Sequence, residues 1–361
     1  MAAQYKLTVK HLDVTTAYLN SDLEEDVYVE PPEELQSEAP KVYVDDLLVL
    51  SSNNDLELEF KTELSKRIEV KDMGEAKEFL GIQIERNKSA DEVYIQQNKY
   101  IINMLEKFKM SDCKPVATPA DPNVKFTEVG NENETDNLAD KELYLEAIGS
   151  LLYVSQVTRP DIAFIVNKLS SFCKEPKQQH WNAVKRVFRY LKGSVDFRLK
   201  YKRVSDQKII GYSDSDWAND TRDRKSITGC IFLMNEGPIS WYSKKQKTVA
   251  LSTVEAEYIA LSFTCQEAMW LRSLTKEIIE KGDQIIELVC DNNGSIINAR
   301  NNSINQRTKH IDLRHHFIRE RIENKEINVR HIGTEENIAD LFTKALARPQ
   351  YECLINKITK L

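Results

Sequence analysis

The sequence predicts a multidomain protein whose C-terminal part is an α/β domain built on a mixed sheet. Its 361 residues suffice for two or three domains of ordinary size. From about residue 206 the pattern gives three strands, a long helix, a strand, further helix, a strand and a last helix, an order typical of α/β domains. The chain lacks the roughly 18 consecutive apolar residues of a membrane span and the apolar core of a secretion signal. A soluble intracellular protein is therefore expected.

Charge is distributed unevenly along the chain. The formal net charge is −7, but residues 1–150 carry 16 basic and 32 acidic side chains, whereas residues 151–361 carry 34 and 25. The basic half is the part that suits a nucleic-acid backbone. The six cysteines are scattered singly, without the paired spacing of zinc or redox sites, so reduced structural thiols are expected.

The first third is expected to hold a loop, a hairpin and a helix. Residues 21–40 contain eight acids and three prolines without apolar periodicity, which indicates a loop. From Phe79, the segments FLGIQIE and EVYIQQ alternate on either side of the turn residues NKSAD, which predicts a hairpin. The following NKYIINMLEKF has helical spacing. A polar, acidic stretch from about Pro115 to Asp140 is expected to be a mobile connection.

Three helices are expected next. The spacing is helical in YLEAIGSLLYVSQVT and PDIAFIVNKLSSFC, which are separated near Arg159, and in WNAVKRVFRYLKG. The third helix has an apolar stripe, and its basic residues lie largely outside that stripe: Lys185, Arg186, Arg189 and Lys192. Such a face suits a phosphate backbone, and an ordinary solvated face is an equally good interpretation of this pattern alone.

The elements of the C-terminal domain follow from alternation and helical spacing. Three short strands are expected in IIGYSDSDWA, SITGCIFLM and PISWYSKK, and a long helix in TVEAEYIALSFTCQEAMWLRSLTKEI. A fourth strand is IELVCDN. After SIINARN come the helical TKHIDLRHHFIRERIENK, a strand at INVRHIG and a final helix from about Asn337.

Four acidic residues stand at the ends of these elements: Asp214 on the first strand, Glu257 in the long helix, Asp291 after the fourth strand and Asp340 in the last helix. Converging carboxylates repel one another, and hard divalent cations offset that repulsion. Two Mg²⁺ ions roughly 4 Å apart can activate a water and stabilise the leaving oxygen of a phosphodiester. Each acid taken singly is more simply a solvated charge, so the weight lies in their order and in the flanking residues.

Several blocks carry a family resemblance: GYSDSDWANDTRDRKSITGCIFL, ISWYSKKQKTVALSTVEAEYIAL, VCDNNGSI, RTKHIDLRHHFIRE and HIGTEENIADLFTK. They resemble the ribonuclease H domain of Pol polyproteins from copia-type LTR retrotransposons. The resemblance implies Asp214, Glu257, Asp291 and Asp340 as the catalytic and metal-binding acids, with Mg²⁺ or Mn²⁺ as cofactor. It also implies His331 as a residue that assists proton transfer, although a structural or surface histidine is an equally valid interpretation.

Two assignments stay open on the residues alone. Asp214 and Asp216 fall on the same face of a strand, so strand parity does not separate them, and the resemblance favours Asp214. Glu255 and Glu257 are about 200° apart on a helix, so only one can face the metals, and the resemblance favours Glu257. The histidines His310, His315 and His316 match no standard zinc spacing and are expected on the exposed side of a helix.

The resemblance continues upstream. MGEAKEFLGIQIE, QNKYIINMLEKFKMSDCKPVATP, AIGSLLYVSQVTRPDIAFIVNKLSSF and HWNAVKRVFRYLKGS resemble the segment that joins the polymerase palm to the ribonuclease H domain in the same family. HLDVTTAYLNSDLEEDVYVEPPE resembles a palm motif and implies Asp13 as a metal ligand. KVYVDDLLVL resembles the Tyr-x-Asp-Asp hairpin of reverse transcriptases and implies Asp45 and Asp46 as the other two.

The palm departs from the family pattern. Asp13 and Asp45 are close in sequence, and the acidic, Pro-broken interval between them lacks the family's Leu-Tyr-Gly-Leu-Lys-Gln-like helix, which positions template and nucleotide. Without positioning, metal-binding acids lose much of their rate enhancement. We therefore expect that polymerase activity is lost by deletion.

The predicted fold class is α/β and α+β multidomain. The predicted parts are a truncated reverse-transcriptase palm (1–125), an acidic linker (126–143), a helical thumb- or connection-like segment (144–205), a ribonuclease H-like mixed-sheet α/β domain (206–347) and a C-terminal tail (348–361).

The expected function is hydrolysis of RNA in RNA:DNA hybrids, with the basic helix binding the backbone. The expected partners are nucleic acid and intact Pol or Gag products of the same element, and no membrane. The expected location is the cytoplasm, within virus-like particles, and the nucleus. The alternatives are a non-enzymatic nucleic-acid-binding remnant or a decaying reading frame. If the missing palm segment between Asp13 and Asp45 is a gene-model artefact, a further alternative is an active reverse transcriptase.

Overall fold

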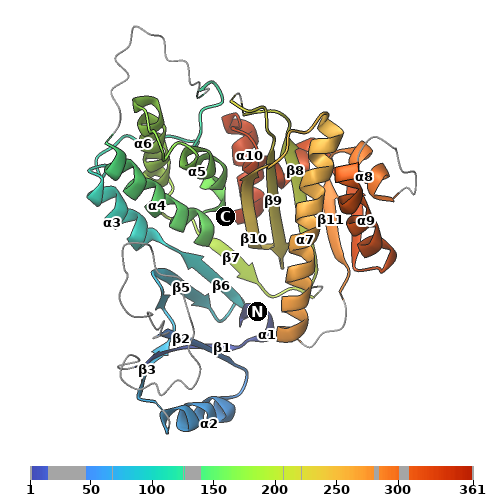
Figure 1. Cartoon of the computed structure of the whole chain (residues 1–361). Coiled ribbons are helices and arrows are strands. Elements are labelled where there is room, and N and C mark those ends of the chain that lie inside the picture. The colour runs from blue at the N-terminus through green and yellow to red at the C-terminus, as the bar shows by residue number, and fades with distance from the viewer. Residues whose placement is uncertain are drawn as a thin grey trace, which may run out of the picture. The chain divides into compact units, whose positions relative to one another are not determined.

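The chain forms two compact units, Met1–Ile95 and Gln96–Leu361 (Figure 1). The computed structural model describes residues 2–14, 46–66, 68–124, 126, 140–205, 207–220, 222–279, 284–300 and 309–359. The sequence places its first boundary near residue 125. The structure assigns 96–124 to the second unit because the helix after Gln96 packs there, with the Phe108 ring stacked on Phe188 at 5.0 Å between ring centroids. Most of the predicted acidic linker, 127–139, lies outside the described residues.

The N-terminal unit is a small α+β structure. Its first sheet has the order β2-β1-β3, with both outer strands antiparallel to β1, and the fully buried Leu12 lies on the central strand. The predicted hairpin is present as β5 and β6. The elements are α1 (Ala2–Tyr5), β1 (Thr8–Val14), β2 (Asp46–Ser51), α2 (Asn54–Ser65), β3 (Val70–Glu75), β4 (Glu78–Phe79), β5 (Ile82–Asn87) and β6 (Glu92–Gln96).

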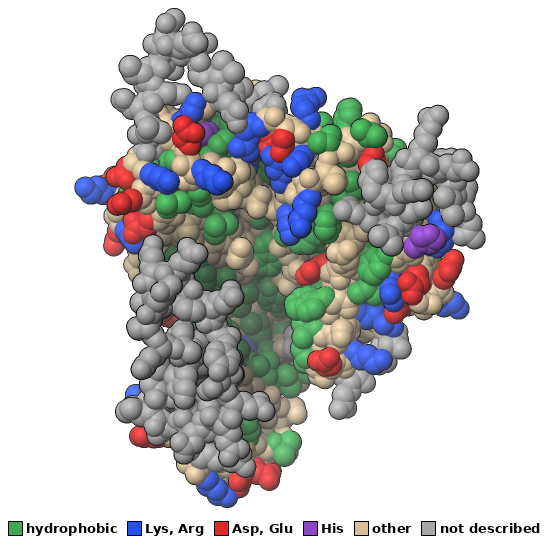
Figure 2. Space-filling model, in the orientation of Figure 1, with side chains coloured by type: hydrophobic (Ala, Val, Ile, Leu, Met, Phe, Trp, Pro, Cys, Tyr) green, Lys and Arg blue, Asp and Glu red, His purple; other side chains and the backbone are tan. Residues whose placement is uncertain are grey.

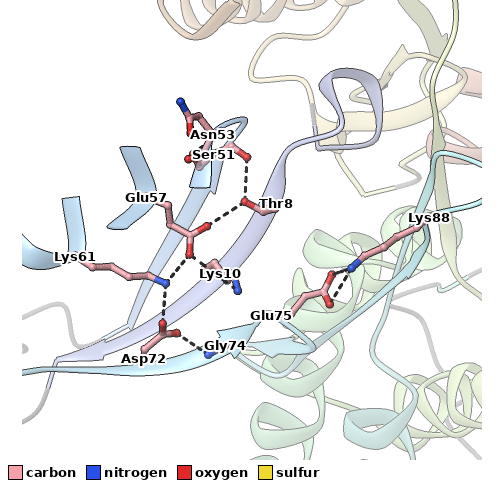
Figure 3. A network of polar contacts seen from close by, with 10 residues as sticks. All are labelled: Thr8, Lys10, Ser51, Asn53, Glu57, Lys61, Asp72, Gly74, Glu75 and Lys88. Atoms are coloured by element: carbon pink, nitrogen blue, oxygen red, sulfur yellow. Dashed lines mark hydrogen bonds and ion pairs between the residues drawn. The ribbon is translucent and has the colours of Figure 1, made fainter. Parts of the chain in front are cut away.

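A polar network joins α2 to the sheet of the N-terminal unit (Figure 3). The Glu57 carboxylate accepts hydrogen bonds from Lys61 Nζ at 2.5 Å and from Thr8 Oγ1 at 3.2 Å, and Lys61 Nζ also donates to Asp72 at 2.7 Å. The hydrogen bond from Lys61 is the main cause that lowers the pKa of Glu57 and of Asp72. The helix is thus attached to β1 and β3 through charged groups that satisfy one another.

The second unit is built on a five-stranded mixed sheet of order β10-β9-β8-β11-β12. β8, β9 and β10 form an antiparallel meander, whereas β11 runs parallel to β8 and β12. This order confirms the α/β domain predicted from the sequence. Its strands are β8 (Ile209–Asp216), β9 (Ile227–Met234), β10 (Gly237–Lys245), β11 (Ile286–Cys290) and β12 (Ile327–His331), and the short β7 (Leu199–Lys202) lies outside this sheet.

Two different layers cover this sheet. Figure 1 shows α7 lying across the strands, and Tyr258 and Leu261 of α7 share an apolar core with Cys230 of β9. Successive residues of a strand face opposite sides, so Gly229 faces the other layer, where it meets Thr343 after η3. The elements of this part are α7 (Thr253–Ile279), α8 (Asn293–Arg300), α9 (Lys309–Glu323), η2 (Thr334–Glu336), η3 (Ile338–Phe342) and α10 (Arg348–Thr359).

No helix in the described part of the chain is both long and apolar enough to cross a membrane.

The helical segment of the second unit is tied to the sheet by buried polar groups. The fully buried Arg159 guanidinium pairs with Asp161 at 2.8 Å, and Asp161 also accepts a hydrogen bond of 2.6 Å from the Tyr190 hydroxyl. The Tyr351 hydroxyl donates to Tyr190 at 2.9 Å, and Trp241 Nε1 of β10 donates to the carbonyl of Ser155 at 2.7 Å. The helices are α3 (Asn98–Lys107), α4 (Lys141–Val157), η1 (Pro160–Ile162), α5 (Ala163–Ser170) and α6 (Gln178–Gly193).

The last part of the chain differs from the sequence prediction. No α-helix starts at Asn337. Its side-chain oxygen accepts from Ala339 N and caps the 3₁₀-helix η3, and its side-chain amide donates to the carbonyl of Ser213 on β8. The stretch from residue 348 is a helix, α10, and not a tail. Its buried Tyr351 and Leu354 pack within the second unit.

Candidate active site

The first two acids of the site come from neighbouring parallel strands. Asp214 lies near the end of the central strand β8, and Asp291 directly follows the last residue of β11. The two strands pair in parallel, with Val289 opposite Tyr212. Because the carboxyl ends of parallel strands meet at one edge of a sheet, both side chains reach the same place.

Glu257 joins them from the first turns of α7. Its Oε1 accepts a hydrogen bond from the backbone N–H of Ser215 at 3.2 Å, which fixes the carboxylate at the end of β8. One carboxylate oxygen each from Asp214, Glu257 and Asp291 lie within 4.8 Å of one another. Asp214 and Glu257 are buried, and Asp291 is half-buried. A set of three carboxylates at this spacing suits a hard divalent cation.

Asp340 reaches the same cluster from η3. Gly229 is paired with Asp214 across β8 and β9, and a Cβ at this position would lie 2.6 Å from Thr343 Cγ2 and 2.8 Å from the carbonyl oxygen of Ala339. The glycine therefore lets η3 approach the sheet. In this position the Thr343 hydroxyl donates to Asp214, and the fully buried Asp340 lies close enough for the Asp214 charge to raise its pKa.

Burial and mutual repulsion disfavour the charged forms of these acids. Burial raises the pKa of Asp214 and holds that of Glu257 well above its ordinary value, and the neighbouring aspartate charges act in the same direction. Burial, with the Asp214 charge, raises the pKa of Asp340 to about 7. The Lys344 ammonium, 3.0 Å from Asp340 Oδ2, opposes these shifts.

The cluster also contains polar atoms without partners. Glu257 Oε2 and Asp340 Oδ1 are buried and have no hydrogen-bond partner among the described residues. A buried carboxylate oxygen without a partner is costly, and a bound cation would remove that cost. The residues therefore fit a divalent metal site on both charge and donor type.

The structure separates the pairs of acids that the sequence left open. Asp216 is not in the three-residue cluster, and its carboxylate accepts a hydrogen bond from Asn219 instead. Burial raises the pKa of Asp216 to about 6. Glu255 Oε2 accepts a hydrogen bond of 2.9 Å from the backbone N–H of Leu251, just before the start of α7. Glu257, in contrast, points to the aspartates.

The candidate histidines lie at different places. His331 Nε2 is 3.2 Å from the backbone carbonyl oxygen of Asp291, so the exposed imidazole stands beside the acidic cluster. His316 is exposed on α9. The side chains of His310 and His315 lie outside the described residues.

Some of the basic residues on α6 already contact other residues of the second unit. Val184, Phe188 and Leu191 are fully buried, as the apolar stripe predicts. Three of the basic residues are engaged: Arg186 pairs with Asp121 at 3.2 Å, Arg189 Nε donates to the carbonyl of Lys114 at 2.7 Å, and Lys192 donates to the carbonyl of Ser111. The half-exposed Lys185 makes no such contact among the described residues. These contacts hold the segment 111–121 against α6, so part of the positive charge of the helix is already paired.

A second basic surface lies beside α5 and was not predicted from the sequence. Figure 2 shows Lys and Arg side chains gathered over the region where Figure 1 draws α5 and the upper end of β8. A cleft of about 230 Å³ beside α5 is lined by the cationic residues Lys168, Arg222 and Arg224 and also by Asp220, which pairs with Arg222 at 2.9 Å. The turn between β8 and β9 supplies both arginines, so this surface adjoins the strand that carries Asp214.

In the N-terminal unit, two of the three predicted acids are neighbours. Asp13 on β1 pairs directly with Asp46 on β2, and Asp46 Oδ1 lies 2.6 Å from His11 Nε2. Asp45 lies outside the described residues. Directly opposed like charges destabilise a pair of strands, and the contact with His11 offsets that effect when the imidazole is protonated.

Sequence reasoning did not find Thr343 and Lys344. Lys344 lies four residues after Asp340, a spacing that signals an ion pair on a helix. Its contact with the cluster depends on where η3 is placed, which the spacing alone does not show.

Part of the chain matches a known family. Residues 40–122 match the family described as reverse transcriptase (RNA-dependent DNA polymerase). The matched range includes Asp45 and Asp46 and begins after Asp13.

Two relatives illustrate the similarity of the whole chain. It is 35% identical over 412 aligned positions to the retrovirus-related Pol polyprotein from transposon TNT 1-94 of Nicotiana tabacum, covering 98% of this chain and 31% of the relative. It is 31% identical to the putative transposon Ty5-1 protein of Saccharomyces cerevisiae, covering 63% of this chain and 72% of that protein. The chain thus spans less than a third of the tobacco polyprotein. Because 412 positions exceed the 361 residues, at least 51 positions of that alignment face a gap in this chain.

Among solved structures, a ribonuclease H1 isolated from compost by a metagenomic approach is 18% identical, with a TM-score of 0.29, and the alignment covers 38% of this chain and 92% of that one. This TM-score is low, and we therefore assign the fold from the sheet order of this chain.

Proposed function

The chain belongs to the family of Pol polyproteins of copia-type retrotransposons, and from this premise we propose that its second unit is a Mg²⁺-dependent ribonuclease H. Its substrate would be the RNA strand of an RNA:DNA hybrid. The observation that carries the proposal is the convergence of Asp214, Glu257 and Asp291 at one edge of the mixed sheet, next to the buried Asp340. The buried carboxylate oxygens without partners support a metal at this place.

Each residue of the site would have a separate task. Asp214, Glu257, Asp291 and Asp340 would hold the divalent ions, with Mn²⁺ as a substitute for Mg²⁺. When bound, these ions would activate the attacking water and stabilise charge on the leaving oxygen of the phosphodiester. The hydroxyl of Thr343 and the backbone N–H of Ser215 keep two of the carboxylates in place through their hydrogen bonds. His331, beside Asp291, would exchange a proton with solvent at the rim of the site.

The nucleic acid would be held through its backbone. Lys185 and the other basic residues of α6, together with the surface of Lys168, Arg222 and Arg224, are the proposed contacts. Such contacts are independent of sequence, and their affinity falls with added salt. The two surfaces belong to the same unit as the acidic cluster.

The test is cleavage of a labelled RNA:DNA hybrid by the full chain in Mg²⁺. We expect cuts in the RNA strand that leave 3′-hydroxyl and 5′-phosphate ends. Asp291→Asn should reduce the rate by roughly 10² or more, because it removes one negative ligand from the cluster. Glu323→Gln, a change of the same type on the exposed end of α9, should cleave like the unmodified chain.

Two outcomes would separate the proposal from its alternative. Binding of the hybrid without cleavage by the unmodified chain would identify a non-enzymatic nucleic-acid-binding remnant. Equal cleavage by Asp291→Asn and by the unmodified chain would place the activity elsewhere or in a contaminant.

We also propose that this chain does not polymerise DNA. The match to the reverse transcriptase family begins at residue 40, and at least 51 positions of the tobacco relative have no counterpart here. We place the missing positions between Asp13 and Asp45. The palm would then retain Asp13 and Asp46, which lie opposite each other, as metal ligands. It would lack the elements that orient template and nucleotide.

A further inference from the structure

We propose that Lys344 is the internal counter-ion of the acidic cluster when metal is absent, and that its ammonium group competes with the divalent cation for the same carboxylates. The inference rests on the metal site of the proposed function, and it assigns a task to a residue outside the metal ligands. Lys344 would therefore be a positioning residue that keeps the metal-free site assembled and sets how tightly a cation binds.

The first observation is the position of the ammonium group. Lys344 Nζ lies 3.0 Å from Asp340 Oδ2, and the Asp340 side chain is completely buried. The same ammonium acts on the charges of Asp214, Glu257 and Asp216. Its direct contact is with Asp340 of η3, and its charge also favours the ionised forms of carboxylates on β8 and α7.

The second observation is that Lys344 stays charged. A lysine amine is ordinarily protonated at neutral pH, and a carboxylate oxygen 3.0 Å from Lys344 Nζ favours the charged form. At neutral pH the side chain is therefore an ammonium ion inside an acidic cluster, which is the role that a metal ion would otherwise have.

The third observation is that the pairing is incomplete. Asp340 Oδ2 accepts from Lys344 and, at 3.3 Å, from Gln350 Nε2, whereas Asp340 Oδ1 and Glu257 Oε2 have no partner among the described residues. The ammonium satisfies one side of the cluster and leaves buried oxygens available for a cation.

The fourth observation is that Lys344 can leave. Its side chain is 34% exposed, so the ammonium reaches the cluster from the solvent side on a flexible stem. A divalent ion brings twice the charge to the same oxygens and would displace it. Binding of metal then includes the cost of breaking the contact between Lys344 and Asp340.

The experiment compares Lys344→Met with Lys344→Arg in the full chain without nucleic acid. In EDTA, Lys344→Met should lower the melting temperature, because the carboxylates lose their counter-ion, and saturating Mg²⁺ should restore most of the loss. In calorimetric titration with Ca²⁺, Lys344→Met should bind about three- to tenfold more tightly, because no ammonium has to be displaced. Lys344→Arg keeps the charge and should stay near the unmodified chain in EDTA.

The matched control is Lys357→Met, which removes one positive charge from α10, where Lys357 donates to the carbonyl of Glu336. It should leave the Ca²⁺ affinity unchanged. An equal gain in Lys357→Met would show a general effect of net charge and would overturn the proposal, as would a Ca²⁺ affinity of Lys344→Met that is unchanged or weaker. If Lys344→Met folds only in the presence of Mg²⁺, the role in the metal-free site is supported.

This test fails separately from the proposed function. A chain that shows both shifts but cleaves no hybrid would refute the nuclease and leave the counter-ion in place. A chain that cleaves hybrid and shows neither shift would do the opposite.

Discussion

Asp340 illustrates how burial and charge act together on a single side chain. It is fully buried, it lies beside Asp214, and one of its oxygens has no partner among the described residues. Burial raises its pKa to about 7, from an ordinary value of 3.8. Without metal the folded chain therefore holds a proton on this group at a pH where the unfolded chain has released it.

The stability of the metal-free protein should depend on pH for this reason. Between about pH 4 and 7 the folded state binds more protons at Asp340, so the free energy of unfolding falls as pH rises, by up to about 1.4 kcal/mol per pH unit. Asp340→Asn resembles the protonated form, so it should flatten this dependence and raise the melting temperature at pH 8. Urea unfolding in EDTA from pH 5 to 8 measures both effects.

Two results would contradict this assignment. One is an unmodified chain that is more stable at pH 8 than at pH 5 in EDTA. The other is an Asp340→Asn variant that keeps the full pH dependence.

At the scale of elements, the close approach of η3 to β9 decides whether the site forms. Asp214 is held by the sheet, whereas Asp340 and Thr343 reach it only because Gly229 has no side chain. The contact joins β9 to a turn more than a hundred residues later in the sequence.

Gly229→Ala should therefore damage the site without changing any acid. The added methyl would lie 2.6 Å from Thr343 Cγ2 and 2.8 Å from a backbone oxygen, so η3 has to move. We expect a loss of about 1 to 3 kcal/mol in the free energy of unfolding and a marked loss of hybrid cleavage. Denaturant unfolding and the cleavage assay test this, with Gly333→Ala as the control, because a Cβ at Gly333 meets nothing within 4 Å. Unchanged cleavage in Gly229→Ala would show that the approach of η3 is dispensable.

Elements with a clear period were predictable from the sequence, and elements shaped by distant contacts were not. Alternation gave the strands around Asp214, and the apolar stripe of Val184 and Phe188 gave α6. The pattern predicts one helix from about Asn337, whereas the structure has the 3₁₀-helix η3, which a bond from Asn337 to Ser213 attaches to β8, and a separate helix α10. That bond joins residues 124 apart, so no local pattern contains it.

The same limit applies to the site. Order along the chain, the flanking residues and the family resemblance selected Asp214, Glu257, Asp291 and Asp340, and the structure brings these four together. Strand parity could not separate Asp214 from Asp216, because only the packing of α7 and η3 around the sheet distinguishes them.

At the scale of the whole molecule, the two units differ in how much of a working site each contains. The second unit has its carboxylates, its basic surfaces and its covering helices in one compact body. The first unit places Asp13 opposite Asp46, while the family match begins only at residue 40.

The full chain should therefore cleave hybrids but fail to extend a primer. On a poly(rA) template with an oligo(dT) primer and Mg²⁺, we expect no products beyond background, because under our proposal the elements that orient the nucleotide have been deleted. Hybrid cleavage by the same preparation serves as the control for folded protein. Processive, Mg²⁺-dependent synthesis would show that the shortened palm is sufficient.

The hydrogen bond between Tyr190 and Tyr351 has a consequence for the time at which the second unit can close during synthesis. The two residues are 161 positions apart in the chain. At a synthesis rate of about 5 to 20 residues per second, Tyr351 leaves the ribosome roughly 10 to 30 s after Tyr190. During that interval α6 and the buried Asp161 lack one of their partners, and their apolar surface is open to other chains. The nascent second unit is thus exposed to aggregation and to chaperones until α10 has been made.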